Sequence, residues 1–201
     1  MHVAFLEASG YLPSTMTHTL CIFEDPEYTQ LLPLVYLRPT WDLRCGILTL
    51  AEKIERAFPG VKTGFVCRGS LVELVREQYP ERTVNAQLSG EVLFVNGRVL
   101  ADAAFARWTE TVPEDTLYVS GSAIVAARLS RQEVSRLRSD ASSLPDFSGL
   151  SHLRRQECTQ SLIRYPWDLV NNNGRQIIAD DESSIAHGAA ARQGTVAPGS
   201  H

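Results

Sequence analysis

Residues 31–54, LLPLVYLRPTWDLRCGILTLAEKI, are the most distinctive stretch of this sequence. The stretch contains TLAE at residues 49–52, a capping box in which the Thr and Glu side chains satisfy the first free N–H groups of a helix. Apolar residues then recur on one helical face, at Ile54, Ala57 and Phe58. Gly60 supplies a stop signal. The sequence therefore predicts a helix that begins directly after residue 49 and ends before residue 60.

Short apolar runs on both sides of this stretch predict buried strands. They are residues 20–23, 64–67 and 92–95, and each ends at polar or turn-forming residues. Because these runs alternate with capped helices, the sequence predicts an α/β domain with a mostly parallel sheet. Ligands of such sheets bind beyond the carboxyl ends of the strands, so the loops after these three runs are the first candidates for a site.

Local patterns also predict further helices and one turn. Capping boxes that begin at Ser70 and Ser130 predict two more helices. Pro166 suits the first turn of a helix that ends near Gly174. On local chemistry alone, the Asn-Gly pair at residues 96–97, between two apolar runs, predicts a two-residue hairpin.

The composition indicates one globular domain. The chain has 201 residues, of which 44% are hydrophobic and 21% charged, and this length is sufficient for one substantial core. The formal net charge is -4 and no basic stripe is present, which argues against a nucleic-acid partner. The densest basic spot, Arg154 and Arg155, is expected to lie on a solvated loop or helix face.

The cysteines and the apolar segments bear on the compartment. Cys21, Cys45, Cys67 and Cys158 lack the spacing of zinc ribbons or redox motifs, and a reducing cytosol is the simplest compartment for them. The first twenty residues lack a signal-peptide pattern, and no apolar run approaches the roughly 20 residues that span a bilayer. We therefore expect a cytoplasmic protein with no membrane partner.

The sequence divides into three segments. Residues 1–17 have mixed polarity and weak periodicity, and form a leader whose order the sequence does not decide. Residues 18–182 form the predicted α/β domain. In residues 183–201, Gly188 and Gly194 lie six residues apart among small residues, which is the period of a parallel β-helix, although such a fold needs at least three repeats. On composition alone, a flexible Ala/Gly/Ser tail is favoured.

Four short pieces together resemble one protein family. They are LPL at residues 32–34, LRP at 37–39, LRCGILT at 43–49 and PWDLVN at 166–171. They are similar to a divergent branch of sugar nucleotidyltransferases, which join a nucleoside triphosphate to a sugar 1-phosphate and release pyrophosphate. The resemblance implies a three-layer, Rossmann-like nucleotidyltransferase fold with a mostly parallel or mixed sheet. It also implies that residues 183–201 are a linker or the first coil of a hexapeptide-repeat β-helix, through which the chain would form homo-oligomers.

Several catalytic elements of that family are missing from this sequence. Such enzymes place a Gly-rich loop after the first strand, where this chain has EDPEY at residues 24–28, with three acids and no glycine. Without glycine the backbone does not easily approach a phosphate, and the acids repel one. The family's lysine is replaced by Thr40, and Arg98 stands where the metal-binding Asp would follow Gly97.

The residues that remain define a candidate site. By the resemblance, Arg38 and Arg44 are the candidate catalytic residues, because arginine side chains clamp phosphate oxygens. Arg38 is also expected to bind substrate, together with Asn96, Gly97 and Arg98. For the arginines, the alternative is an ion pair with a nearby acid.

Asp168 is the candidate metal ligand. The metal implied by the resemblance is Mg²⁺, provided that the domain is active. An Asp in the first turn of a helix also stabilises the helix dipole, and this structural role is the alternative.

Two functions stay open from the sequence. In the first, the domain binds a nucleotide, a sugar phosphate or a nucleotide sugar, and an active form would catalyse attack of a sugar 1-phosphate on the α-phosphorus of a nucleoside triphosphate. In the second, it has lost catalysis and is an interaction or regulatory domain attached to a hexapeptide acyltransferase-like domain. Convergence of Arg38, Arg44 and Arg98 on an open cleft favours the first function. Pairing of these arginines with nearby acids favours the second.

Overall fold

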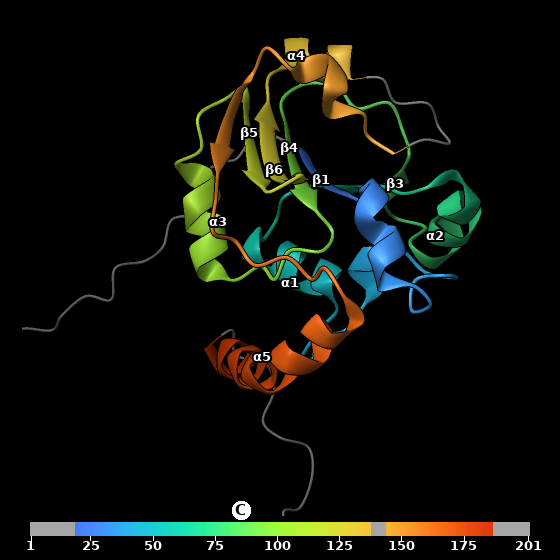
Figure 1. The fold of residues 1–201 in the computed structure, drawn as a ribbon, viewed down its shortest axis with the longest axis vertical. Coiled ribbons are helices and arrows are strands. Elements are labelled where there is room, and N and C mark those ends of the chain that lie inside the picture. The colour runs from blue at the N-terminus through green and yellow to red at the C-terminus, as the bar shows by residue number, and fades with distance from the viewer. Residues whose placement is uncertain (1–18, 138–143, 187–201) are drawn as a thin grey trace, which may run out of the picture.

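A seven-stranded sheet forms the centre of the computed structural model, which describes residues 19–137 and 144–186 (Figure 1). The strand order is β3-β2-β1-β4-β6-β5-β7. Only β6 runs antiparallel to its neighbours, so the sheet is mixed but mostly parallel, as predicted. The strands are β1 (Thr19–Phe23), β2 (Thr63–Val66), β3 (Thr83–Val84), β4 (Val92–Asn96), β5 (Thr116–Ser120), β6 (Ala123–Leu129) and β7 (Arg154–Glu157).

Helices cover both faces of the sheet and make three layers. Helices α1, α2 and α3 pack on one face, and α4 with η4 packs on the other. The α-helices are α1 (Leu50–Ala57), α2 (Val72–Gln78), α3 (Ala103–Glu110), α4 (Arg131–Arg136) and α5 (Pro166–Ala186). The 3-10 helices are η1 (Pro26–Leu31), η2 (Thr40–Asp42), η3 (Gly69–Leu71) and η4 (Phe147–Leu150). The three-layer α/β fold expected from the sequence is confirmed.

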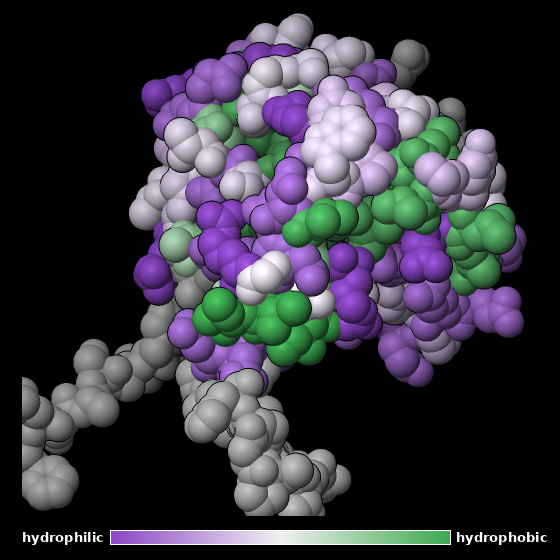
Figure 2. Space-filling model, turned by 60° about the horizontal axis from the view of Figure 1, so that its bottom comes forward, coloured by the Kyte–Doolittle hydropathy of each residue, from purple (hydrophilic) through white to green (hydrophobic). Residues whose placement is uncertain are grey.

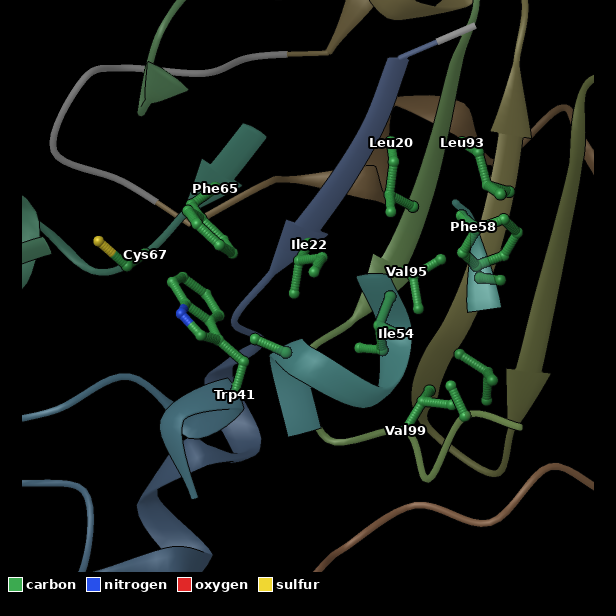
Figure 3. Close-up of a cluster of buried hydrophobic side chains, with 14 of the residues drawn as sticks. Leu20, Ile22, Trp41, Ile54, Phe58, Phe65, Cys67, Leu93, Val95 and Val99 are labelled. Carbon is green, nitrogen blue, oxygen red and sulfur yellow. The ribbon is translucent and has the colours of Figure 1, made fainter. Parts of the chain in front are cut away.

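Alternating side chains of the central strands build two separate cores. On β1, Leu20 and Ile22 point into the cluster beneath α1–α3, whereas Cys21 and Phe23 point into the cluster beneath α4. In the first cluster the indole of Trp41 stacks on the ring of Phe65, with centroids 5.0 Å apart (Figure 3). Because both faces of the central strands β1, β2 and β4 are buried, these strands are mostly apolar, which is why they form short apolar runs in the sequence.

The capping box at residues 49–52 is formed as predicted. The Thr49 hydroxyl accepts a hydrogen bond from the N–H of Glu52, and the Glu52 carboxylate accepts one from the N–H of Thr49. The expected box at Ser70 is not formed, because η3 occupies residues 69–71 and α2 begins at Val72 without a side-chain cap. A short 3-10 helix followed by an α-helix therefore replaces the single helix predicted there.

The longest helix, α5, continues well beyond Gly174, where the sequence predicted its end. Its later turns are held by Asp180, whose carboxylate accepts hydrogen bonds from the N–H groups of Ile47 and Leu48 and pairs with the buried ammonium of Lys53. Gly46 makes this approach possible, because a Cβ there would lie 2.5 Å from the Asp180 carboxylate. Contacts across more than 120 residues thus extend the helix past a residue that usually ends one.

Two other local predictions were wrong for the same kind of reason. The Asn-Gly pair at 96–97 makes no hairpin, because Gly97 donates its N–H to Phe23 of β1 and Val99 pairs with Leu162 instead. The basic residues Arg154 and Arg155 lie on β7, an exposed edge strand that pairs with β5, and not on a loop or helix. Charged side chains are common on edge strands because they discourage pairing with other chains.

The predicted leader, residues 1–17, and residues 187–201 of the predicted linker or β-helix coil lie outside the described residues. Residues 183–186, the start of that last segment, continue α5. Within the two described ranges, no helix is both long and apolar enough to cross a bilayer.

The anchor of α5 yields a stability prediction. Asp180→Ala should lower the free energy of unfolding by about 3–5 kcal/mol, because it leaves the buried Lys53 ammonium without its carboxylate. Urea denaturation of the purified variants measures this loss. The control is Glu73→Ala, which breaks the exposed pair with Arg76 and should change stability by less than about 1 kcal/mol. Equal losses in the two variants would contradict the prediction.

Candidate functional site

The carboxyl ends of β1, β2 and β4 meet at one edge of the sheet, as expected for neighbouring parallel strands. The loop after β1 carries Glu24 and Asp25 and then enters η1 at Pro26. A 3-10 helix that starts with proline follows β1, where the resemblance implied a glycine-rich loop. Its backbone is therefore not arranged as a cradle of N–H groups for phosphate.

Glu24 is buried and receives hydrogen bonds from two directions. Its carboxylate accepts from the N–H of Thr40 at 3.0 Å and from the guanidinium of Arg68 at 2.6 Å. Burial raises the pKa of Glu24 above its ordinary value, and the charge and hydrogen bonds of Arg68 with the Thr40 N–H oppose that rise. Arg68 was missed in the sequence, although its place directly after an apolar strand run was a usable signal.

Arg98 is fully buried and pairs with two acids of the η1 region. Its guanidinium contacts the carboxylate of Asp25 and lies 3.0 Å from that of Glu27. Asn96 supports the arrangement, because its amide donates to Asp25 at 2.8 Å and its oxygen accepts from the Arg98 N–H at 3.0 Å. We call Asp25, Glu27, Asn96 and Arg98 the carboxylate–arginine cage.

Gly97 fits beneath the segment that carries Thr40 and Trp41. A Cβ at this position would lie 3.0 Å from the Trp41 ring and 3.2 Å from the Thr40 hydroxyl. Close packing inside the protein therefore disfavours a residue larger than glycine at this position.

Glu27 joins the cage to the lead-in of α5. Its carboxylate accepts a hydrogen bond from Ser122 at 2.5 Å and lies 3.6 Å from the guanidinium of Arg164, which also donates to Ser120. Although burial alone raises the pKa of Glu27, the hydrogen bonds from Ser122 and Arg98 and the charges of the two arginines hold it below its ordinary value. Glu27 is thus held as a carboxylate.

The edge is electrically balanced as a result. Three carboxylates, those of Glu24, Asp25 and Glu27, face three guanidinium groups, those of Arg68, Arg98 and Arg164. A triphosphate carries several negative charges, so a phosphate site requires cations that are not already neutralised. These three arginines do not meet that requirement.

The other two predicted arginines lie apart from the cage. Arg38 is exposed beside the edge, where its carbonyl accepts from Arg68 at 3.3 Å and its charge acts on Asp42. Arg44 is exposed on the short hairpin of residues 44–49, which lies beneath α5. Its guanidinium donates to the carbonyl of Ile47. Of Arg38, Arg44 and Arg98, only the last is buried in the cage, so the structure does not bring the three side chains together.

Asp168 serves as the cap of α5. Its carboxylate accepts from the N–H groups of Arg164 at 2.8 Å and Tyr165 at 2.9 Å. In the described part of the chain, no group of three or more His, Cys, Asp or Glu side chains could hold a metal ion. At the edge itself, the Arg98 guanidinium lies between the two nearest carboxylates, Asp25 and Glu27. The residues present do not fit the Mg²⁺ site that the resemblance implied.

Three buried polar atoms at the edge have no hydrogen-bond partner among the described residues. They are Asp25 Oδ1, Thr40 Oγ1 and Arg98 Nε. An unsatisfied buried polar group is unfavourable, so such atoms mark places where a water molecule or a small polar ligand group would gain hydrogen bonds.

The burial of the cage predicts that Arg98 contributes more to the stability of the domain than Arg164 does. Arg98→Met should lower the free energy of unfolding by about 3–5 kcal/mol, because it leaves the buried Asp25 carboxylate without its cation and removes one of the two arginines that pair with Glu27. Arg164→Met removes a partly exposed arginine from the same Glu27 and should cost about 1 kcal/mol. Thermal and urea denaturation of the two variants measure the difference, and a larger loss for Arg164→Met would contradict the assignment.

Two solved structures that match this chain are nucleotidyltransferases by name. The inositol-1-phosphate CTP transferase of T. maritima is 10% identical, with a TM-score of 0.54 over 90% of this chain and 100% of that chain. A Bacillus anthracis protein assigned as a glucose-1-phosphate thymidylyltransferase, solved with sucrose, is 8% identical, with a TM-score of 0.44 over 89% of this chain and 97% of that chain. At such identities, the T. maritima structure supports the fold alone. No curated protein matches the sequence.

A family model gives the decisive comparison. The model described as sugar nucleotidyl transferase matches residues 20–188, which include nearly the whole sheet, the cage and α5. The matched range also contains the four sequence pieces on which the resemblance was based. Because the match extends over most of its length, this chain belongs to the sugar nucleotidyl transferase family.

Proposed function

We propose that this domain has kept the fold of a sugar nucleotidyl transferase without nucleotidyl transfer, and that it acts as a non-catalytic interaction domain. The observation that carries the proposal is the burial of Arg98 between Asp25 and Glu27. The positive charge of Arg98 is neutralised by acids of the protein itself. A transferase needs such a charge for the phosphates of its substrate.

The chemistry of nucleotidyl transfer supports this proposal. The reaction depends on donors and cations placed where charge develops on the transferred phosphate. In this chain the loop after β1 offers carboxylates in place of backbone donors, and Thr40 uses its N–H to bind Glu24. Loss of a single such electrostatic contact lowers a rate by about 10²–10³-fold, and here several are replaced together.

A pyrophosphate-release assay tests the loss of transfer. The full chain is incubated with each common nucleoside triphosphate, a panel of sugar 1-phosphates and Mg²⁺, with a sugar nucleotidyltransferase of established activity as the positive control. We expect no pyrophosphate above the protein-free reaction. Mg²⁺-dependent pyrophosphate formed together with an equal amount of nucleotide sugar would overturn the proposal.

A second candidate function is binding of a sugar phosphate or nucleotide sugar without its turnover. It is favoured by an exposed cationic side chain at the edge, because sugar phosphates and nucleotide sugars present a negatively charged phosphate group. The exposed Arg38 beside the edge is available for a phosphate group. A ligand of this class needs fewer free cations than a triphosphate does.

Isothermal titration calorimetry of the full chain with sugar 1-phosphates and nucleotide sugars tests this second function. If one of them binds, Arg38→Ala should weaken binding by about 10- to 150-fold, since a hydrogen bond to a charged group contributes roughly 1.5–3 kcal/mol. The matched control is Arg107→Ala, which removes an exposed arginine of α3. The binding function is excluded if no ligand gives heat, and the role of Arg38 is excluded if both variants bind alike.

A further inference from the structure

Helix α5 lies on the domain with its polar side inward. The residues that contact the hairpin below it include Asn173, which accepts from Gly46 at 2.8 Å, and Asp180, which accepts from Ile47. On the same side, Leu169 packs against a smaller, third cluster of buried apolar residues that includes Leu43, Cys45 and Ile163. A surface helix normally turns its apolar stripe inward and its polar residues outward, and α5 does the reverse.

The outward side of α5 is correspondingly apolar. Trp167 is 57% exposed, Val170 75%, Ile177 43% and Ile178 61%. These residues recur at spacings of three, seven and one, which places them on one helical stripe. Figure 2 brings the face around α5 forward and shows patches of apolar surface on it, bordered by polar residues.

The stripe is centred on a glycine. Gly174 lies four residues after Val170 and four before Ile178, and a Cβ at Gly174 would have nothing within 4 Å. Glycine is the least favourable residue for a helix interior after proline, and nothing within the described part of the chain requires it here. Small residues in the middle of an apolar stripe allow another helix to approach closely.

We propose that α5 pairs antiparallel with α5 of a second copy of this chain, with the two helices crossing at Gly174. In this arrangement the two glycines face each other at the twofold axis. Val170 packs against Ile178 of the partner subunit, and Ile178 packs against the partner subunit's Val170. Such an interface is isologous, because each copy contributes the same surface.

Charge favours the antiparallel orientation of such a pair. The later turns of α5 carry the exposed acids Asp181 and Glu182. An antiparallel crossing centred on Gly174 keeps these acids of the two copies at opposite ends of the interface. A parallel pair would instead bring the acids of both copies together, where they repel.

The size of the patch fits a modest dimer. Tyr165 stacks on Trp167 at 4.6 Å, and Ile47, 45% exposed, borders the later turns of α5. Tyr165 thus extends the stripe at the first turn of α5. Stable interfaces bury about 800 Å² on each partner, and a single crossing of two helices belongs with the smaller, transient interfaces. We therefore expect a dimer that dissociates at low protein concentration.

Sedimentation velocity of the full chain over a range of concentrations tests the dimer. Wild-type protein should sediment as a dimer at high concentration, and Val170→Asp with Ile178→Asp should sediment as a monomer. The matched control is Leu74→Asp, which places the same charge at an exposed apolar residue of α2 and should remain dimeric. A wild-type chain that is monomeric at every concentration would overturn the proposal, whether a different protein or residues 1–18 covers the stripe.

A second variant separates the interface from folding. Gly174→Leu improves helix propensity, so the melting temperature of the monomer should not fall, yet the added side chain blocks the close crossing. We expect the dissociation constant of the dimer to increase at least tenfold. An unchanged dimer would show that the helices do not cross at Gly174.

Site-specific oxidation tests the geometry directly. In a Cys158→Ser background, which removes the one partly exposed cysteine of the described chain, Gly174→Cys should form a disulfide-linked dimer under mild oxidation. Arg107→Cys on α3 should not. The inference is independent of the proposed loss of nucleotidyl transfer, because the pyrophosphate assay concerns the cage and these experiments concern only α5.

Discussion

The ion pairs of buried Arg98 join three parts of the structure that are far apart in the sequence. Its guanidinium binds Asp25 and Glu27, which follow β1, while its backbone belongs to the turn after β4. Its carbonyl also accepts from Ile163 at 2.8 Å, in the segment that leads into α5. A cation buried without its partners would be strongly unfavourable, so the loop after β1, the end of β4 and the entry to α5 have to lie together.

This constraint gives the family fold a different chemistry at its functional edge. Members of a fold can differ in function because function resides in a few side chains at the site and not in the sheet that carries them. Here acids follow β1 and an arginine follows β4, and the two attract each other. The result is a network of ion pairs at the edge, and the proposed loss of nucleotidyl transfer rests on this network.

In the proposed interaction role, α5 and not the cage supplies the contact surface. The helix is fastened to the domain by polar contacts, chiefly those of Asp180 with the hairpin at residues 44–49. This anchorage frees its apolar residues to face outward. A surface of this kind, held rigidly on a folded domain, is a common basis for association between proteins.

The sequence by itself determined the alternation of strands and capped helices, the family and the residues that stand in the catalytic positions. These features depend on local patterns, such as the capping box at residues 49–52, which forms as predicted. It also determined that the loop after β1 carries acids and that an arginine, Arg98, follows the Asn-Gly pair at residues 96–97. The absence of a glycine-rich phosphate cradle follows directly from the identity of these residues.

Only the tertiary structure decided which charges neutralise one another and which face of α5 is free. Arg98 and Asp25 are 73 residues apart, and Asp180 and Ile47 are 133 residues apart, so no local pattern connects them. The local signals predicted a hairpin at residues 96–97 and the end of a helix near Gly174. The hairpin was overridden by the bond of Gly97 to β1, and the helix end by the contacts of Asp180 with the hairpin at residues 44–49. The physical reason is that a buried charge or an unpaired backbone N–H or C=O group bonds to whichever partner the fold places beside it. The number of residues between the two partners in the sequence does not affect this bonding.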